Sequence, residues 1–251
     1  MLRIASYNIQ KAIGADYRRR PSRTVDVLRE IDADVVVLQE ADRRFGARAA
    51  AVPPELIRSR TDLVPAKLAV RPLSLGWHGN AVLVRRGVRV LKSKRLVLPY
   101  LEPRGAVEVV VELDQGPLVV IGTHLALTTK WRRRQAEQLA EFAERADMPM
   151  LLCGDLNEWP SAGTGLEPLR AVFSEHAPGR TFPAIRPVAA LDRFYHCGNL
   201  TLEAQVHDTP LARSASDHLP IVARAERLRT RETGPGDPPA RHARPAPGKV
   251  A

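Results

Sequence analysis

The sequence predicts an α/β fold in which a single domain contains two β-sheets. Short apolar or alternating runs typical of strands are frequent, runs with helical spacing are few, and the two kinds interleave along the chain. With 251 residues, of which 44% are hydrophobic, the chain is long enough for one large α/β domain or for two small domains. The interleaved order of the elements favours the single domain.

The first predicted elements are two strands with a helix between them: Leu2–Asn8, Ser22–Ile31 and Asp34–Gln39. The first strand alternates in hydropathy, whereas the second is continuously apolar, as is typical of a strand buried on both faces. We expect Ser22 to be the N-cap of the helix, because its hydroxyl can accept a hydrogen bond from the first turn. The Ala-, Pro- and Arg-rich residues 43–63 follow no clear pattern.

Four more strands are predicted in the middle of the chain: Asn80–Arg85, Arg89–Leu98, Ala106–Leu113 and Leu118–Thr123. An Arg-Arg-Gly turn separates the first two strands, and a Gln-Gly-Pro turn precedes the last. The last three strands are expected to form an antiparallel meander.

The clearest helix is Trp131–Ala146, followed by the strands Met150–Cys153, Ala189–Cys197, Leu200–Val206 and Leu219–Ala225. Its expected apolar face consists of Trp131, Leu139, Phe142 and Ala146. Lys130 and the arginines at 132–134 gather near its start, which we interpret as a solvated face rather than a phosphate-binding patch.

Residues 1–228 form the expected domain, and residues 229–251, rich in Pro and Arg, are expected to be a disordered tail. The formal net charge of +10 favours polyanionic partners such as nucleic acids, phospholipid headgroups or phosphate esters. Cys153 and Cys197 lie far apart in apolar runs, which favours two reduced thiols, with a single disulfide as the alternative. We recognise no secretory signal and no apolar run of membrane-spanning length, so a cytoplasmic protein, monomeric by default, is expected.

Polar residues recur where the predicted strands end or begin: Asn8, Glu40, His124, Asp155, Asn157, Asp217 and His218. In an α/β domain such positions tend to converge on one rim. Carboxylates such as Glu40 and Asp217 are hard oxygen donors that suit Mg²⁺ or Mn²⁺, and two histidines can transfer protons near neutral pH. Asp155 and Asn157 are two residues apart and therefore point to the same side of an extended chain.

The chain carries an ordered series of motifs: SYNIQ, VVVLQEAD, HGNAVLV, PRGAV, GTHLAL, LLCGDLNEWP, LDRFY and ASDHLPIVA. Between Leu2 and Ala225 this series resembles the motif order of the endonuclease/exonuclease/phosphatase superfamily, and in particular its small bacterial members. The resemblance implies a deoxyribonuclease I-like fold, a four-layer α/β sandwich with two central mixed β-sheets flanked by helices. Each residue alone also fits an ordinary structural role, and only the joint order of the motifs favours catalysis.

The resemblance also implies roles. Glu40 matches the metal-binding glutamate, with Asp217 as a second metal contact and Asn8 as a neighbour of metal and phosphate. The implied catalytic residues are His218, Asp192, Asp155, Asn157 and His124, with Asp192 orienting His218 and with Asp155 and Asn157 serving the attacking water. Arg104 matches an arginine that binds substrate phosphate. Nucleases that the chain resembles pair the histidine matched by His124 with a glutamate near the HGNAV position, where this chain has His78.

The expected function is therefore Mg²⁺- or Mn²⁺-dependent hydrolysis of phosphate esters, with a phosphodiesterase or nuclease as the first candidate. One alternative is an enzyme acting on a phospholipid or a small-molecule phosphate. A second alternative is a binding module that holds polyanions through its basic charge and catalyses nothing.

Overall fold

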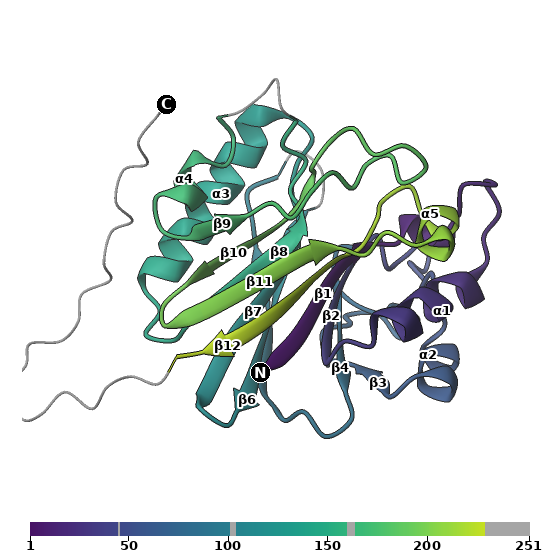
Figure 1. Ribbon diagram of the computed structural model, residues 1–251, viewed down its shortest axis with the longest axis horizontal. Helices are drawn as coiled ribbons and strands as arrows, with labels where there is room; N and C mark the ends of the chain where they lie inside the picture. Colours follow the sequence, from purple (N-terminus) through teal and green to yellow (C-terminus); the bar gives the residue numbers. More distant parts are fainter. Residues whose placement is uncertain (45, 101–103, 160–163, 229–251) are drawn as a thin grey trace, which may run out of the picture.

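A computed structural model describes residues 1–44, 46–100, 104–159 and 164–228, and the tail expected at 229–251 lies outside these residues. Within the described residues, twelve strands form two mixed six-stranded sheets (Figure 1). The first sheet has, in spatial order, β11 (Leu200–Val206), β12 (Ile221–Arg227), β1 (Leu2–Asn8), β2 (Val35–Gln39), β4 (Ala81–Arg85) and β3 (Leu63–Pro65). The second has β5 (Val90–Val97), β6 (Gly105–Leu113), β7 (Gly116–His124), β8 (Met150–Asp155), β10 (Asp192–Cys197) and β9 (Ser174–His176).

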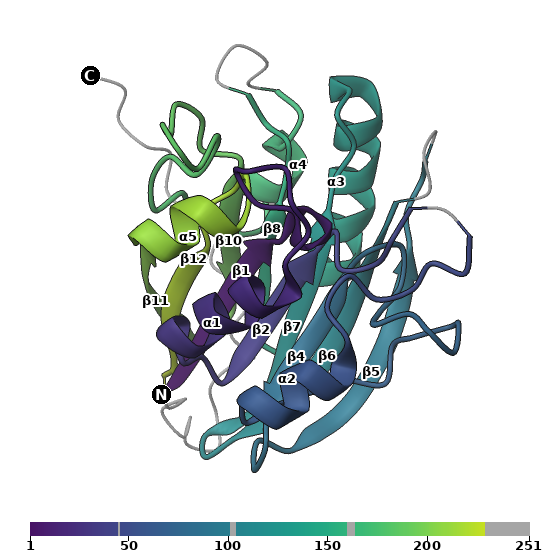
Figure 2. The same ribbon diagram turned by 90° about the vertical axis from the view of Figure 1, so that its right-hand side faces the viewer.

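Helices cover the outer face of each sheet, which confirms the expected four-layer sandwich. The first sheet is covered by α1 (Pro21–Ile31), α2 (Pro54–Arg60) and α5 (Pro210–Ala215), with the short 3-10 turn η1 (Gln10–Ala12) after β1 (Figure 2). The second is covered by α3 (Thr129–Glu144) and α4 (Glu167–Arg170). Between the sheets, Ile4, Val37, Val120 and Leu151 belong to one buried apolar cluster. Apolar clusters fill the three interfaces between the four layers, and burial of this apolar surface is the main force that stabilises the fold.

One parallel pair of strands lies near the middle of each sheet, and these pairs position the candidate site. β1 is parallel to β2, and β7 is parallel to β8. All these strands are apolar and buried along most of their length, as their continuous apolar runs predict. A hydrogen bond from Asn8 at the end of β1 to Asp155 at the end of β8 shows that the carboxyl ends of both pairs lie at the same end of the sandwich.

Two local predictions need correction. Ser22 is not the N-cap of α1, because the helix begins one residue earlier at Pro21, whose fixed φ suits the first helical position, and Arg20 precedes it without a side-chain cap. The Arg-Arg-Gly turn after β4 does not join two neighbouring strands. It carries the chain from the first sheet to the second, where β5, β6 and β7 form the expected antiparallel meander.

The buried face of α3 also differs from the prediction. Trp131 is only half-buried, whereas Arg132 is fully buried together with Gln135, Leu139 and Ala143. The interpretation of Arg132 as part of a solvated face is therefore wrong. The unassigned residues 43–63 include α2 and the start of β3.

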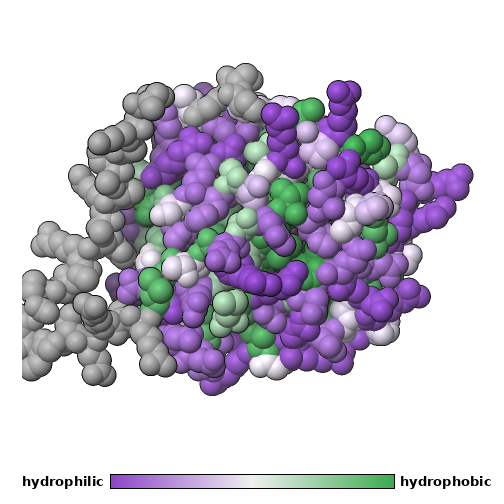
Figure 3. Space-filling view, viewed as in Figure 1, coloured by the Kyte–Doolittle hydropathy of each residue, from purple (hydrophilic) through white to green (hydrophobic). Residues whose placement is uncertain are grey.

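Cys153 lies in the middle of β8 and Cys197 at the end of β10, and both thiols are free, so the alternative of a disulfide is wrong. No helix in the described part of the chain combines the length and the apolar character needed to cross a membrane. On the face shown in Figure 3, hydrophobic residues occur in small separate groups among hydrophilic ones.

Candidate active site

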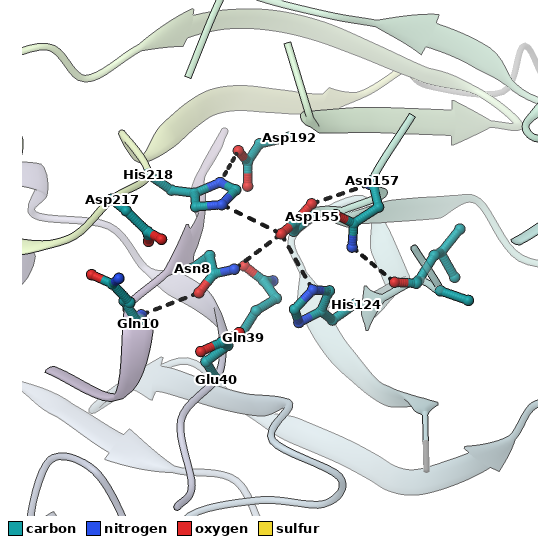
Figure 4. A network of polar contacts seen from close by, with 12 residues as sticks. Asn8, Gln10, Gln39, Glu40, His124, Asp155, Asn157, Asp192, Asp217 and His218 are labelled. Atoms are coloured by element: carbon teal, nitrogen blue, oxygen red, sulfur yellow. Dashed lines mark hydrogen bonds and ion pairs between the residues drawn. The ribbon is translucent and has the colours of Figure 1, made fainter. Parts of the chain in front are cut away.

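The two parallel strand pairs bring the predicted polar residues together at one rim (Figure 4). Asn8 and Gln39 are register partners at the ends of β1 and β2. His124 and Asp155 are register partners at the ends of β7 and β8. Asp192, the first residue of β10, lies opposite Asp155 on the other side. Residues far apart in the sequence therefore meet because their strands end at the same level.

Asp155 lies at the centre of this group. Its Oδ2 atom accepts a hydrogen bond from Asn8 Nδ2 at 3.0 Å. The same oxygen lies 3.3 Å from His124 Nε2 and 3.6 Å from His218 Nε2. Three side-chain nitrogens thus converge on one buried carboxylate oxygen. Burial raises the pKa of Asp155, against the lowering effect of the His218 charge.

A glycine allows β7 and β8 to bring these groups so close. Gly154 precedes Asp155 with φ +155°, and a Cβ atom there would lie only 1.8 Å from the carbonyl oxygen of Thr123. Any other residue would therefore push the two strands apart. The glycine of the GDLN motif follows from the required distance between His124 and Asp155.

Asn157 completes the loop after β8. Its backbone N–H donates to Asp155 Oδ1 at 3.1 Å, and its side-chain Nδ2 donates to the Leu125 carbonyl at 2.9 Å. The second bond ties Asn157 to the residue after His124. The amide oxygen of Asn157 is then the atom left to accept a hydrogen bond from a bound water.

Asp192 and His218 form a buried pair beside Asp155. His218 Nδ1 lies 2.8 Å from Asp192 Oδ2, which also accepts a hydrogen bond from Thr181 Oγ1 at 2.6 Å. The Phe182 ring packs against the imidazole with a centroid distance of 4.9 Å. Burial lowers the pKa of His218, but the charges of Asp192 and Asp155 outweigh burial and raise it. The two carboxylates therefore favour the protonated imidazole.

His124 has the opposite electrostatic environment. It is buried, and burial together with the charge of Arg104 holds the pKa of His124 well below its usual value. The site thus contains one histidine that favours its charged form and one that favours its neutral form. No described glutamate pairs with His124, whose carboxylate neighbour is Asp155.

Glu40 and Asp217 provide a second group of carboxylates on the side of the first sheet (Figure 4). Glu40 directly follows β2 and forms an ion pair with Lys11. Burial raises the pKa of Asp217, and the nearby Glu40 charge raises it further, although His218 lowers it. Two carboxylates that destabilise each other's charge are the kind of donor set that a hard divalent cation stabilises. Asn8 lies beside them, with its Oδ1 accepting the Gln10 N–H at 3.1 Å.

The described residues also contain a compact group of candidate ligands formed by Asp155, Asp192 and His218, whose donor atoms lie within 4.8 Å of one another. In this group, Asp192 and His218 are hydrogen-bonded to each other, and Asp155 accepts a hydrogen bond from Asn8. The oxygen-only set around Glu40 and Asp217 suits a hard cation better than this mixed set.

A buried ion pair joins the two loops of the second sheet that carry catalytic candidates. Arg132 Nε donates to Glu158 Oε2 at 2.7 Å, and its other nitrogens donate to the Ala126 and Leu127 carbonyls and to Thr129. Glu158 Oε1 accepts the N–H of Gly165 at 3.0 Å. We call these contacts the Arg132–Glu158 clamp. The clamp holds the loop after His124 against the loop after Asp155.

The structure brings the predicted residues Asn8, His124, Asp155, Asn157, Asp192 and His218 together in one network of contacts. The prediction from sequence did not include Thr181 or the clamp. Ser216 is also part of the site, because its hydroxyl donates to the Asn8 carbonyl at 2.7 Å, and its place in the SDH motif was an available signal. Asn80 links the loop before β4 to the start of β6, since its Nδ2 donates to the Gly105 carbonyl at 2.9 Å. Nothing in the local sequence marks Thr181.

Comparisons with known proteins identify the family of the chain. Residues 5–218 match the Endonuclease/Exonuclease/phosphatase family. The uncharacterized protein YbhP of Escherichia coli is 29% identical over 243 residues, which cover 88% of this chain and 94% of YbhP.

Two solved structures resemble the fold at low identity. The mannosyl-6-phosphatase Bt3783 of Bacteroides thetaiotaomicron has a TM-score of 0.68 at 16% identity, with 90% of this chain and 100% of that chain covered. TDP2 of D. rerio, complexed with a single strand DNA product, has a TM-score of 0.67 at 16% identity, with 90% and 98% covered. At this identity the two structures support the fold alone. The family match, in contrast, spans most of the sequence, and the chain therefore belongs to the endonuclease/exonuclease/phosphatase family.

Proposed function

We propose that the protein is a metal-dependent phosphodiesterase that acts on nucleic acid. The observation that carries this proposal is the convergence of Asn8, His124 and His218 on Asp155 Oδ2, within 3.0 to 3.6 Å. This network lies beside the Glu40 and Asp217 carboxylates. Proton-transferring groups next to hard oxygen donors are what hydrolysis of a phosphate ester requires.

Glu40, Asp217 and Asn8 are the residues that would hold the cation, Mg²⁺ or Mn²⁺. Their fit rests on the oxygen donors and on the raised pKa of Asp217 beside Glu40. When bound, such a cation supplies positive charge that offsets the negative charge on the phosphate oxygens. Lys11, which pairs with Glu40, is partly exposed and lines the adjoining cavity, and a bound cation would take its place beside Glu40.

Asp155 and Asn157 position the attacking water. Asp155 ends β8 and Asn157 lies on the loop after it, where the hydrogen bond from Asn157 Nδ2 to the Leu125 carbonyl fixes the orientation of the amide. As the bond from the water oxygen to phosphorus forms, the water proton passes to Asp155, whose pKa is raised by burial, and as the bond to the leaving oxygen breaks, its electron pair stays on that oxygen. The Asp155 and Asp192 carboxylates stabilise the protonated His218.

His124 and Arg104 act on the phosphate from the other side. Both line the cavity that adjoins Asp155. The lowered pKa of His124 means that it acts as a neutral donor, whereas Arg104 supplies a permanent charge. Together with Asn8 and Asn157 they stabilise the charge that develops on the phosphate oxygens in the transition state.

The net charge of +10 supports nucleic acid as the substrate. The alternative is a lipid or small-molecule phosphate, and a cavity of about 580 Å³ beside the catalytic network favours this alternative. The two structures with a similar fold are compatible with either substrate class, since one is a mannosyl-6-phosphatase and the other is complexed with a DNA product. Two free thiols support a reducing compartment such as the cytoplasm.

The test compares nicking of supercoiled plasmid with hydrolysis of a phospholipid headgroup in the same Mg²⁺ buffer. Plasmid cleavage that disappears in Asp155→Ala and His218→Ala supports the nuclease. Lipid turnover beside intact plasmid would replace the nuclease with the alternative. Polyanion binding without any metal-dependent turnover would leave only a binding module.

A further inference from the structure

A cavity of about 580 Å³ extends from the catalytic network along the first-sheet side of the rim. His124, Arg104 and Glu40 line it where it meets the catalytic network. The rest of its wall comes from two loops, one after β2 and one before β4, which contribute arginines: Arg43, Arg44, Arg48 and Arg71. The proposed hydrolysis uses none of these four side chains.

The cavity wall is strongly basic. Six basic side chains line it, the four arginines together with Lys11 and Arg104, against the two acids Glu40 and Asp42. Asp42 serves the fold, because its carboxylate accepts the backbone N–H groups of Leu75 at 2.6 Å and Gly76 at 3.3 Å. Glu40 belongs to the proposed cation site. The arginines of the two loops therefore supply more positive charge than a single scissile phosphate needs.

The shape of the cavity suits a compact anionic group. Trp77 forms part of the wall and packs against Gly105, where a Cβ atom would lie 2.3 Å from the indole ring. The indole therefore cannot shift towards β6, and the cavity keeps a firm wall on that side. Guanidinium groups bind phosphate oxygens through paired N–H donors, so arginine suits this task better than lysine.

We propose that this cavity binds a second phosphate group of the substrate, a phosphomonoester carried in addition to the ester that is cleaved. The inference rests on the proposed function and narrows its substrate class. The second phosphate can belong to the 5′ end of an oligonucleotide or to a phosphorylated headgroup, and the recognition chemistry is the same in both.

The test uses three kinds of substrate with the full chain and Mg²⁺. Bis(p-nitrophenyl) phosphate has no second phosphate and serves as the reference. Dithymidine monophosphate with and without a 5′-phosphate forms the oligonucleotide arm. Glycerophosphoinositol with and without a 4-phosphate forms the headgroup arm. In at least one arm, the added phosphate is expected to lower KM by about tenfold or more, the scale of one charge-assisted hydrogen bond.

Variants then locate the effect. Arg43→Ala and Arg71→Ala are expected to remove most of that gain and to leave kcat/KM for bis(p-nitrophenyl) phosphate unchanged. Arg145→Ala is the matched control, because it removes the same charge from an exposed site on the end of α3, outside the cavity. It should preserve the gain. An equal loss on all substrates, or no gain from a second phosphate in either arm, would overturn the proposal.

A binding measurement separates this proposal from the proposed function. In EDTA, calorimetry should detect tighter binding of the phosphorylated member of the favoured pair, and Arg71→Ala should abolish the difference. If the protein binds in this way but hydrolyses nothing with any metal, the proposed function fails and the cavity assignment stands. If it hydrolyses bis(p-nitrophenyl) phosphate but binds both members equally, the cavity assignment alone fails.

Discussion

The two sheets contribute different halves of the candidate site. The rim of the second sheet carries Asp155, Asp192 and His124, all buried and all within a continuous set of polar contacts. The rim of the first sheet carries Glu40, whose side chain keeps 23% of its surface exposed, against 2% for Asp155. It pairs with the side chain of Lys11, which is itself partly exposed.

This difference suits two tasks of the proposed mechanism, proton transfer and the exchange of a cation. A group that moves protons must be held in one geometry, and the clamp and the backbone hydrogen bonds provide that on the second sheet. A group that exchanges a hydrated cation and substrate must be accessible, and Glu40 opens onto the cavity. We therefore expect changes at Asp155 or in the clamp to affect folding and activity together, whereas changes at the more exposed Glu40 affect activity alone.

The largest expected effect on stability is at the Arg132–Glu158 clamp. Arg132→Met should lower the free energy of unfolding by about 3–5 kcal/mol, because Glu158 would remain buried without its charged partner. Glu40→Gln on the other rim should change it by less than about 1 kcal/mol, as expected for a partly exposed pair. Urea unfolding followed by circular dichroism measures both.

A double variant tests whether the loss of stability comes from the unpaired charge of Glu158. Arg132→Met combined with Glu158→Leu removes both charges and should recover part of the lost stability. Equal losses for Arg132→Met and Glu40→Gln would show that the clamp stabilises the fold no more than the partly exposed pair at Glu40 does.

The next effect concerns the buried pair that joins the two rims, Asp192 at the start of β10 in the second sheet and His218 just before β12 in the first. His218→Ala should lower kcat on bis(p-nitrophenyl) phosphate by about a hundredfold or more, the usual scale for a proton-transferring group. Asp192→Ala acts on the same step, so the double variant should be hardly worse than the worse single one. Near wild-type turnover by His218→Ala, with the fold intact, would remove this pair from the mechanism. Purely additive losses would show that the two residues act separately.

The smallest effect is expected at the tail. Residues 229–251 have no apolar periodicity, so truncation after Leu228 should change the free energy of unfolding by less than about 0.5 kcal/mol. Turnover of bis(p-nitrophenyl) phosphate should also be unchanged, since both rims lie within residues 1–228. A larger loss of stability would mean that the tail contributes to the packing of the domain.

The fold was predictable because its central strands are continuous apolar runs with polar ends. Asn8, His124 and Asp155 could be recognised as site residues for the same reason, since each ends such a run. Pairing between strands was harder. The turn after β4 looks like a hairpin from its composition, yet tertiary packing places β4 and β5 in different sheets.

The clamp could not be predicted from local sequence. Arg132 lies among other cations at the start of a helix, and its partner Glu158 follows 26 residues later on a separate loop. Helical spacing alone cannot distinguish a buried arginine from an exposed one when neighbouring positions are also basic. Thr181 could not be predicted for a similar reason, because its hydrogen bond to Asp192 forms only when the fold brings the two residues together.

In the proposed mechanism, Glu40 at the rim of the first sheet holds a catalytic cation beside the buried network around Asp155. The most direct measurement is turnover of bis(p-nitrophenyl) phosphate by wild-type protein in EDTA and after titration with Mg²⁺ or Mn²⁺, with melting temperature recorded in parallel. We expect no turnover in EDTA and full recovery with metal, together with a metal-dependent rise in melting temperature. Glu40→Ala should lose both the turnover and the rise while remaining folded. Full turnover by the metal-free wild-type protein would contradict the account.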